Sequence, residues 1–330
     1  MKNNFERLRI GVCGVGSIGF RHARLLSQRN SVELYIGDTT PAHLEAAASL
    51  PNLAGSTGSF DELIGSGLDA LVIATPDRFH VEQAEAACRK KIAVLIEKPI
   101  AETAAQGNRL NQCALESGNR ILVGYPLRFN ALFLKAREIM NESVIGNPVS
   151  FSVMLGAYNT LVAAKNRFSP SDRNTLFVDY SHEWDYINWF LGKVRRVAAI
   201  SHQSGDMERT QNPNVVDGVF ELESGISGTV HLDYVHTPGK RTFTIIGDKG
   251  TMVVDAVKGT VSVQVYREEF ERVHRIVESF DQMMQRQHDH FIDVIGGKAE
   301  PKVTVEDGLN ALRVADAMIA ACDDGTWNLI

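Results

Sequence analysis

The sequence predicts an α/β protein in which an N-terminal, doubly wound parallel sheet precedes an α+β domain with a mostly antiparallel sheet. Three observations support this prediction. Short apolar runs alternate with helix-like stretches up to about residue 125, strand-like segments dominate after it, and 330 residues exceed what one hydrophobic core usually organises. We therefore expect a first domain over residues 1–125 and a second over residues 126–330.

In the first part, continuous apolar runs predict strands that are buried on both faces. These runs are residues 8–12, 33–36, 70–74, 92–96 and 120–123. The amphipathic stretches between them predict helices over residues 18–28, 41–49, 80–89 and 103–117. Strands that alternate with helices form parallel βαβ units, with helices on both faces of the sheet.

The second part opens with a predicted helix over residues 130–141, and a helix over 180–191 closed by Gly192 interrupts the strands that follow. The predicted strands are residues 148–155, 194–201, 216–222, 226–234, 241–247, 251–255 and 261–266. The segments 247–250 and 258–259 are typical of hairpin turns. Two further helices are expected over 279–295 and 305–322.

Composition excludes several classes of function. Hydrophobic residues make up 44% and charged residues 22% of the chain, which is ordinary for a globular protein, and the formal net charge of −6 gives no electrostatic reason to bind nucleic acid or an anionic membrane. The four cysteines are scattered, so neither a disulfide framework nor a thiolate metal site is expected. No apolar run approaches the ~18 residues of a membrane span, and the polar start carries no signal core. We expect a cytoplasmic protein.

A glycine-rich turn follows the first strand and opens the first helix. Gly14, Gly16 and Gly19 have the spacing of a dinucleotide-binding fingerprint, and Ser17 and Ile18 lie between the last two glycines, where the helix would begin. In this motif the first glycine allows the turn, the second lets the main chain approach the pyrophosphate, and the third packs helix on strand. The alternative is that the three glycines only make a turn.

Asp38 ends the second strand, 19 residues after Gly19, where a carboxylate can bind the adenosine ribose. Thr39, Thr40 and Pro41 follow it, without a cation for a 2′-phosphate, so NAD is favoured over NADP. The turn containing Thr75 and Pro76, before His80, can line the nicotinamide half of the cofactor. The same turn can also be an ordinary helix cap, and both interpretations can hold together.

Lys98 lies in Glu97-Lys98-Pro99, directly after a buried strand, at the sheet edge where ligands bind in such folds. A partly buried lysine can accept a hydroxyl proton or steady a developing oxyanion, whereas the alternative is a solvated surface lysine. A second candidate set is Asp179 and His182. On an ideal helix Trp184, Ile187 and Leu191 form the buried stripe, and Asp179, His182, Tyr186 and Trp189 lie opposite, either solvated or lining a cleft.

Other polar residues could reach a substrate, although each could equally form a salt bridge or lie on a strand face. They are Arg128, Tyr158, Arg167, Tyr234, His236 and Arg241. His288 and His290 are two residues apart on a predicted helix, so their side chains point apart, and we set metal catalysis aside.

At these positions the chain resembles the Gfo/Idh/MocA oxidoreductases, relatives of glucose–fructose oxidoreductase and inositol dehydrogenase. The resemblance runs nearly end to end. It is carried by the Gly14/Gly16/Gly19 turn, Thr75-Pro76 with His80, Glu97-Lys98-Pro99, Gly124-Tyr125 with Arg128-Phe129, and the segments 182–185 and 246–251.

The resemblance implies a Rossmann domain, then an α/β domain whose open, mostly antiparallel sheet forms a homodimer or homotetramer, and a last helix, about 305–322, that packs back on the first domain. It implies NAD- or NADP-dependent hydride transfer on a sugar, polyol, sugar acid or nucleotide sugar. Lys98, Asp179 and His182 are then the catalytic set, and Glu97 lies near the nicotinamide ribose. Either His182 or Lys98 is the proton acceptor, and the other one forms a hydrogen bond with the reacting oxygen. Many members place the aspartate four residues before the histidine, where this chain has Val178.

Two other functions stay open. An enzyme that retains NAD could oxidise a sugar transiently to assist an elimination or hydrolysis, and a regulator could sense NAD without catalysis.

Overall fold

The computed structural model describes residues 7–118, 120–158, 175–203 and 213–330. They form two compact units. Unit 1 comprises Met1–Pro126 with Phe280–Leu309, and unit 2 comprises Leu127–Ser279 with Asn310–Ile330. The last helix, α11 (Val305–Asp324), begins in unit 1 and continues in unit 2. The domain boundary at residue 125 and the packing of this helix on the first domain stay predictions.

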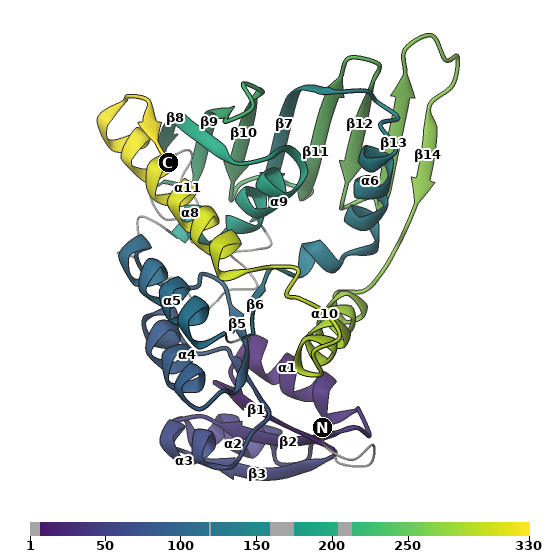
Figure 1. The fold of residues 1–330 in the computed structure, drawn as a ribbon. Coiled ribbons are helices and arrows are strands. Elements are labelled where there is room, and N and C mark those ends of the chain that lie inside the picture. Colours follow the sequence, from purple (N-terminus) through teal and green to yellow (C-terminus); the bar gives the residue numbers. More distant parts are fainter. Residues whose placement is uncertain (1–6, 119, 159–174, 204–212) are drawn as a thin grey trace. The chain divides into compact units, whose positions relative to one another are not determined.

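Unit 1 is a six-stranded parallel sheet in the order β3-β2-β1-β4-β5-β6 (Figure 1). Its strands are β1 (Leu8–Cys13), β2 (Val32–Gly37), β3 (Leu53–Thr57), β4 (Ala70–Ile73), β5 (Ala93–Glu97) and β6 (Ile121–Gly124). Its helices are α1 (Ser17–Ser27), α2 (Pro41–Ala47), α3 (Phe60–Gly65), η1 (Asp77–Phe79), α4 (His80–Arg89), α5 (Ala104–Ser117) and α10 (Phe280–Ile295). The strand order reverses between β1 and β4, so the ligand crevice of such a sheet is expected at their carboxyl ends.

Unit 2 is built on a nine-stranded sheet in the order β14-β13-β12-β11-β7-β10-β9-β8-β15, antiparallel except for the pair β7 and β10. Its strands are β7 (Pro148–Gly156), β8 (Val194–His202), β9 (Val215–Leu222), β10 (Ser227–Asp233), β11 (Lys240–Gly247), β12 (Gly250–Asp255), β13 (Thr260–Val265), β14 (Arg272–Arg275) and β15 (Asn328–Leu329). Its helices are η2 (Pro126–Phe129), α6 (Ala131–Asn141), α8 (Thr175–Asp179), α9 (Ser181–Leu191) and most of α11. These two sheets confirm the predicted fold class.

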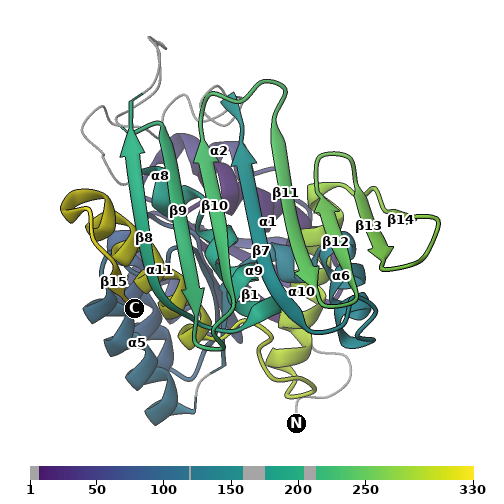
Figure 2. The same cartoon turned by 90° about the horizontal axis from the view of Figure 1, so that it is seen from above.

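Helices of unit 2 cover one face of this sheet. On α9, Trp184 stacks on Phe220 of β9 and Tyr186 packs against Phe243 of β11. All four rings are at most 1% exposed, so they form the centre of the core. Figure 2 shows the sheet from its other face, which no described helix of unit 2 covers. Among the described residues, no helix combines the length and apolar character needed to cross a membrane.

One sequence prediction about this region is wrong. Asp179 ends α8 and His182 lies in the first turn of α9, and the chain leaves helical geometry at Tyr180, with φ −93° and ψ 21°. The two residues therefore do not share one helical face. Tyr186 is also fully buried rather than on a polar face, because its ring packs against Phe133 and Phe243 and its hydroxyl lies 3.4 Å from Oε1 of Glu183.

Candidate active site

Unit 1 contains a cleft of about 480 Å³ at the carboxyl ends of β1, β2 and β4, the place where the strand order reverses. Its lining includes Gly14, Asp38, Thr39, Thr75 and Pro76. Four of these five residues were predicted from the sequence to surround a dinucleotide, the fifth, Thr39, follows Asp38 directly, and the fold brings them together. Gly16, Ser17 and Ile18 follow Gly14 in the turn that opens α1.

The three glycines of the turn are required for different reasons. Gly14 has φ +81°, and a Cβ there would lie 2.7 Å from the Ala74 carbonyl oxygen. A Cβ on Gly19 would lie 1.7 Å from the Gly14 carbonyl oxygen, so no side chain fits between helix and strand. A Cβ on Gly16 would meet only His43 Cε1, at 3.8 Å. Packing within the chain thus explains Gly14 and Gly19, whereas a Cβ at Gly16 would meet only an ordinary van der Waals contact.

The amino end of α1 suits an anion. Gly16 is its N-cap and supplies no side-chain oxygen, and the first turn carries no acidic residue. The first N–H groups of a helix, from Ser17 onward, have no intrahelical acceptor, and they point out of the helix together with its positive dipole end. These N–H groups, which begin three residues beyond Gly14 of the cleft lining, fit the pyrophosphate of a dinucleotide.

Asp38 is fixed as an acceptor at the end of β2. One oxygen accepts the Val15 main-chain N–H at 2.7 Å and the other accepts that of Thr40 at 2.8 Å, while His43 lies 3.1 Å away. Burial raises the pKa of the carboxyl, but these hydrogen bonds outweigh burial, and the pKa of Asp38 lies below its usual range. An ionised, oriented carboxylate at this place fits the ribose hydroxyls of NAD.

His80 connects two loops at the same edge of the sheet. Its Nδ1 lies 2.7 Å from the Pro99 carbonyl oxygen and its Nε2 lies 2.8 Å from the Thr75 carbonyl oxygen, and the side chain is 1% exposed. These contacts join the turn after β4 to the segment after β5. The direct contact between His80 and the cofactor that the sequence suggested stays a prediction.

Lys98 follows β5 and is half-buried. The preceding Glu97 accepts the Lys98 main-chain N–H with Oε2 at 3.3 Å, and its Oε1 lies 2.8 Å from Nε2 of His22 on α1. His22 in turn contacts His288 of α10, with 2.7 Å between Nδ1 and Nε2. Sequence reasoning missed His22, although a histidine on the apolar side of α1, beside Leu25 and Leu26, is a detectable anomaly.

In unit 2 the parallel pair β7 and β10 brings several predicted substrate residues to one edge. Tyr158 and His236 follow these strands, and the Tyr158 N–H donates to the His236 carbonyl oxygen at 3.3 Å. The hydroxyl of Tyr234 lies 3.5 Å from Oδ2 of Asp179. Burial, and then the charge of Asp179, raise the pKa of Tyr234, so the phenol stays protonated and donates.

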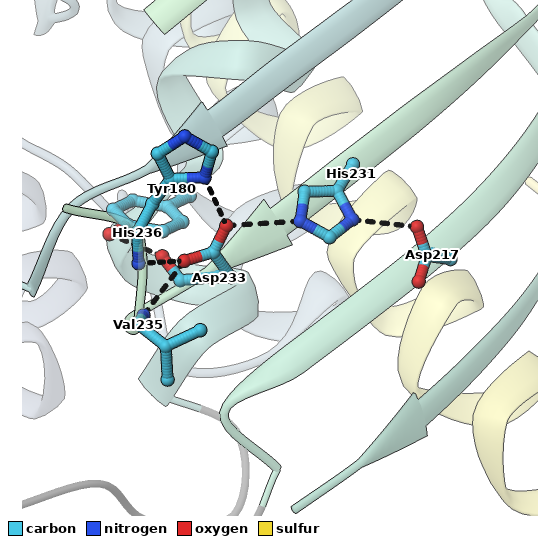
Figure 3. A network of polar contacts seen from close by, with 6 residues as sticks. All are labelled: Tyr180, Asp217, His231, Asp233, Val235 and His236. Carbon is cyan, nitrogen blue, oxygen red and sulfur yellow. Dashed lines mark hydrogen bonds and ion pairs between the residues drawn. The ribbon is translucent and has the colours of Figure 1, made fainter. Parts of the chain in front are cut away.

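Asp233 organises the turn that carries these residues (Figure 3). Its Oδ1 accepts the N–H groups of Val235 at 2.7 Å and His236 at 2.6 Å. Its Oδ2 lies 3.0 Å from Nε2 of His231, whose Nδ1 lies 2.7 Å from Asp217. Burial lowers the pKa of His231, but the two carboxylates outweigh burial and raise it above its ordinary value.

Two predicted substrate arginines are held by carboxylates of α9. Arg128 binds Asp185 with Nη2 2.7 Å from Oδ1, and these side chains are only 7% and 1% exposed. Arg241 binds Glu183 with Nη2 2.7 Å from Oε1, and Glu183 is fully buried. Both arginines therefore anchor α9, the helix that carries His182. Arg167 lies outside the described residues.

Both halves of the chain match models of one protein family. The model GFO_IDH_MocA, described as an oxidoreductase family with an NAD-binding Rossmann fold, matches residues 8–125, and the model of the same family's C-terminal alpha/beta domain matches residues 137–329. The chain belongs to the Gfo/Idh/MocA oxidoreductase family. Its N-terminal Gfo/Idh/MocA domain is an NAD-binding domain, in agreement with the cleft described above.

Individual relatives are distant in sequence. The Gfo/Idh/MocA chain is 26% identical to inositol 2-dehydrogenase 1 of Saccharopolyspora erythraea over 97% of its own length and 95% of that protein's. A levoglucosan dehydrogenase in complex with NADH and levoglucosan has a TM-score of 0.87 at 17% identity and covers 98% of this chain and 100% of its own. A scyllo-inositol dehydrogenase from Lactobacillus casei, with NAD(H) and scyllo-inositol, has a TM-score of 0.83 at 22% identity and covers 98% and 99%.

Within the described residues, no group of three or more His, Cys, Asp or Glu side chains is arranged to hold a metal ion.

Proposed function

We propose that this protein is an NAD-dependent dehydrogenase that transfers a hydride between the nicotinamide and a CH–OH carbon of a polyol or sugar. The observation that carries the proposal is the cleft of unit 1, which is lined by Gly14 of the turn before α1 and by the ionised Asp38. The family assignment supports hydride chemistry, and the relatives that act on inositol and levoglucosan support a sugar-like alcohol.

The bound cofactor would supply the hydride acceptor. Asp38 would hold the ribose, and the N–H groups of the first turn of α1 would hold the pyrophosphate. Lys98 would contact the reacting oxygen, because it directly follows β5 at the edge of the sheet where ligands bind. Asp179 and His182, at the junction of α8 and α9, would hold or move the hydroxyl proton.

Tyr158, Tyr234 and His236 would contact the substrate from the turns that follow β7 and β10, since these turns lie at one edge of the sheet in unit 2. Arg128 and Arg241 would act on substrate only if they keep hydrogen-bonding capacity beyond Asp185 and Glu183.

We further place the protein in the cytoplasm and propose that it is a homodimer or homotetramer. The face of the nine-stranded sheet seen in Figure 2 supports self-association, because no described helix of unit 2 covers it and strand alternation directs to it apolar side chains that are 44–66% exposed. They are Ile200, Val219 and Ile246. Light scattering of the purified chain measures the oligomeric state directly.

The experiment that tests the function is nicotinamide absorbance of purified protein across polyols, sugars, sugar acids and nucleotide sugars, with NAD and NADP offered separately. We expect reduction of NAD with one substrate class and a weaker rate with NADP. Tight NAD binding without net reduction on any of these compounds would contradict a simple dehydrogenase. That result would favour the enzyme that retains its cofactor, or the sensor.

A further inference from the structure

Three ionisable side chains of unit 1, those of Glu97, His22 and His288, form a hydrogen-bonded chain that begins at the residue before Lys98. The proposed reaction gives no role to the two histidines. His22 of α1 lies between Glu97 of β5, at 2.8 Å, and His288 of α10, at 2.7 Å. Both imidazoles are fully buried, and the Glu97 side chain is 13% exposed. Three elements far apart in the sequence therefore converge on one carboxylate, next to the lysine that is the first catalytic candidate.

The hydrogens in this chain can be placed by counting donors. A carboxylate only accepts, so Nε2 of His22 carries a hydrogen and donates it to Glu97. If Nε2 of His288 then donates to Nδ1 of His22, both rings are neutral and Nδ1 of His288 is an acceptor that has no hydrogen-bond partner among the described residues. If His22 were an imidazolium, His288 would instead keep its hydrogen on Nδ1 as an orphaned buried donor, which is the rarer and costlier arrangement.

The surroundings favour a neutral His288. Burial, then the neighbouring His22 and the charge of Arg29, hold the pKa of His288 well below its usual range. Burial raises the pKa of Glu97, but the hydrogen bond from His22 and the electrostatic attraction to it, followed by the charge of Lys98, outweigh burial and lower it. Glu97 is thus a carboxylate whose negative charge His22 stabilises. The charge of Lys98, the residue that follows Glu97 in the chain, acts on the same carboxylate.

We propose that His22 and His288 are positioning residues that hold the Glu97 carboxylate ionised beside Lys98, and that this carboxylate is the counter-charge of the Lys98 side chain. Lys98 then acts as a cation and hydrogen-bond donor toward the reacting oxygen, and another group accepts the hydroxyl proton. This assignment rests on the proposed function and narrows it, because the sequence leaves open whether Lys98 or His182 is the proton acceptor.

The test measures the reactivity of the Lys98 amine in the protein without cofactor or substrate. Trace labelling with acetic anhydride over a series of pH values, quantified on the Lys98 peptide by mass spectrometry, gives the pH of half-maximal reactivity. Glu97→Gln removes the counter-charge, so we expect this pH to fall by about one unit or more, the size typical of a close opposite charge.

Two variants of nearly equal shape test His22. The amide nitrogen of a glutamine occupies the place of Nε2, so His22→Gln keeps the donor to Glu97 and should label like wild type. The amide nitrogen of an asparagine occupies the place of Nδ1, so His22→Asn loses that donor. We expect His22→Asn to shift Lys98 in the same direction as Glu97→Gln by a smaller amount. His290→Gln is the control and should not shift it, because His290 lies two residues along α10 from His288 and accepts the Lys302 N–H.

A Lys98 profile that is unchanged in Glu97→Gln would overturn the proposal, as would equal profiles for His22→Gln and His22→Asn in proteins of wild-type melting temperature. Because the labelling needs neither NAD nor substrate, its outcome is independent of the proposed function. Once a substrate is known, His22→Asn should lower kcat about tenfold and change KM little, and His22→Gln should restore kcat. Loss of kcat in both variants alike would count against positioning.

Discussion

In unit 1 the glycine turn at the candidate cofactor cleft offers main-chain groups, whereas in unit 2 the polar side chains around α9 are held by other charged side chains. The turn at Gly14, Gly16 and Gly19 offers N–H groups and space. Around α9, Glu183 and Asp185 are buried against Arg241 and Arg128, which are 58 and 57 residues away in the sequence. The first kind of site is local in the sequence, and the second depends on contacts made only in the folded chain.

The difference has a consequence for substitutions. A substitution in the glycine turn should weaken cofactor binding without unfolding the protein. The exception is a glycine that is also packed against neighbouring main chain. A change in a buried ion pair should alter stability first, because the remaining charge has lost its partner in an apolar environment. Loss of cofactor binding should therefore dominate at the glycine turn and loss of stability at the buried ion pairs, with Lys98 as the most sensitive position for chemistry.

The largest effect is expected for Lys98→Met. A methionine keeps much of the side-chain volume and removes the ammonium, so we expect kcat to fall by about 10²–10⁴-fold, the range typical of a group that transfers or steadies a proton. NAD affinity, measured by fluorescence titration, should stay close to wild type. Lys90→Met, at an exposed lysine after α4, is the matched control. Wild-type turnover in Lys98→Met would remove this residue from the catalytic set.

The next largest effect is expected for Arg241→Met, which leaves the fully buried Glu183 without its cation. Loss of one partner of a buried pair costs about 3–5 kcal/mol, so denaturant unfolding should show a large destabilisation. Arg195→Met is the control, because Arg195 is 60% exposed in its pair with Glu221 and should cost about 1 kcal/mol or less. Unchanged stability together with a raised KM would instead make Arg241 a substrate ligand.

The same contrast explains what could be predicted from the sequence. In unit 1 the strands that form continuous apolar runs and the helices between them were predicted to within a few residues. Strand β3 and helix α3 were missed, because β3 is an edge strand whose side chains alternate between half-buried and exposed. In unit 2 the exposed edge strands β14 and β15 were missed for the same reason. Burial on one face only leaves a weak apolar pattern.

For the candidate site, glycine chemistry and the position of Asp38 indicated the cleft without knowledge of the fold. No local sequence pattern indicated that Arg128 and Arg241 form ion pairs with carboxylates of α9. Nor did one indicate that His22 contacts His288, which is 266 residues away. The break at Tyr180 was also invisible, since neither a glycine nor a proline marks it. Pairing between distant segments is decided by the fold, and a single sequence carries no record of it.

A smaller effect separates two glycines of one turn. Gly16 has φ −68°, which any residue adopts, and space for a Cβ, so Gly16→Ala should keep wild-type stability and weaken NAD binding about tenfold, or 1.4 kcal/mol. Gly19→Ala places its Cβ against the Gly14 carbonyl oxygen and should cost about 1–3 kcal/mol of stability. Calorimetric binding and unfolding measurements on both variants give this comparison. Equal losses of stability in Gly16→Ala and Gly19→Ala would show that packing within the chain, and not the approach of a ligand, requires the glycine at position 16.

The smallest effect concerns His231, held between Asp217 and Asp233 in unit 2, with His236 on the far side of Asp233. Its pKa is raised in the folded chain, so the folded state binds the proton more tightly than the unfolded state. The resulting stability is complete below the ordinary pKa of about 6.5 and is lost as the pH rises through the folded value.

His231→Gln keeps hydrogen-bonding capacity and removes the charge. It should therefore be less stable than wild type by about 1 kcal/mol or less at mildly acidic pH, and this difference should shrink as the pH rises. Melting temperatures across the neutral range measure it. Because Asp233 also holds the turn of Val235 and His236, the same variant should change KM more at acidic than at alkaline pH. A stability difference that grows with pH would contradict stabilising ion pairs of His231 with Asp217 and Asp233.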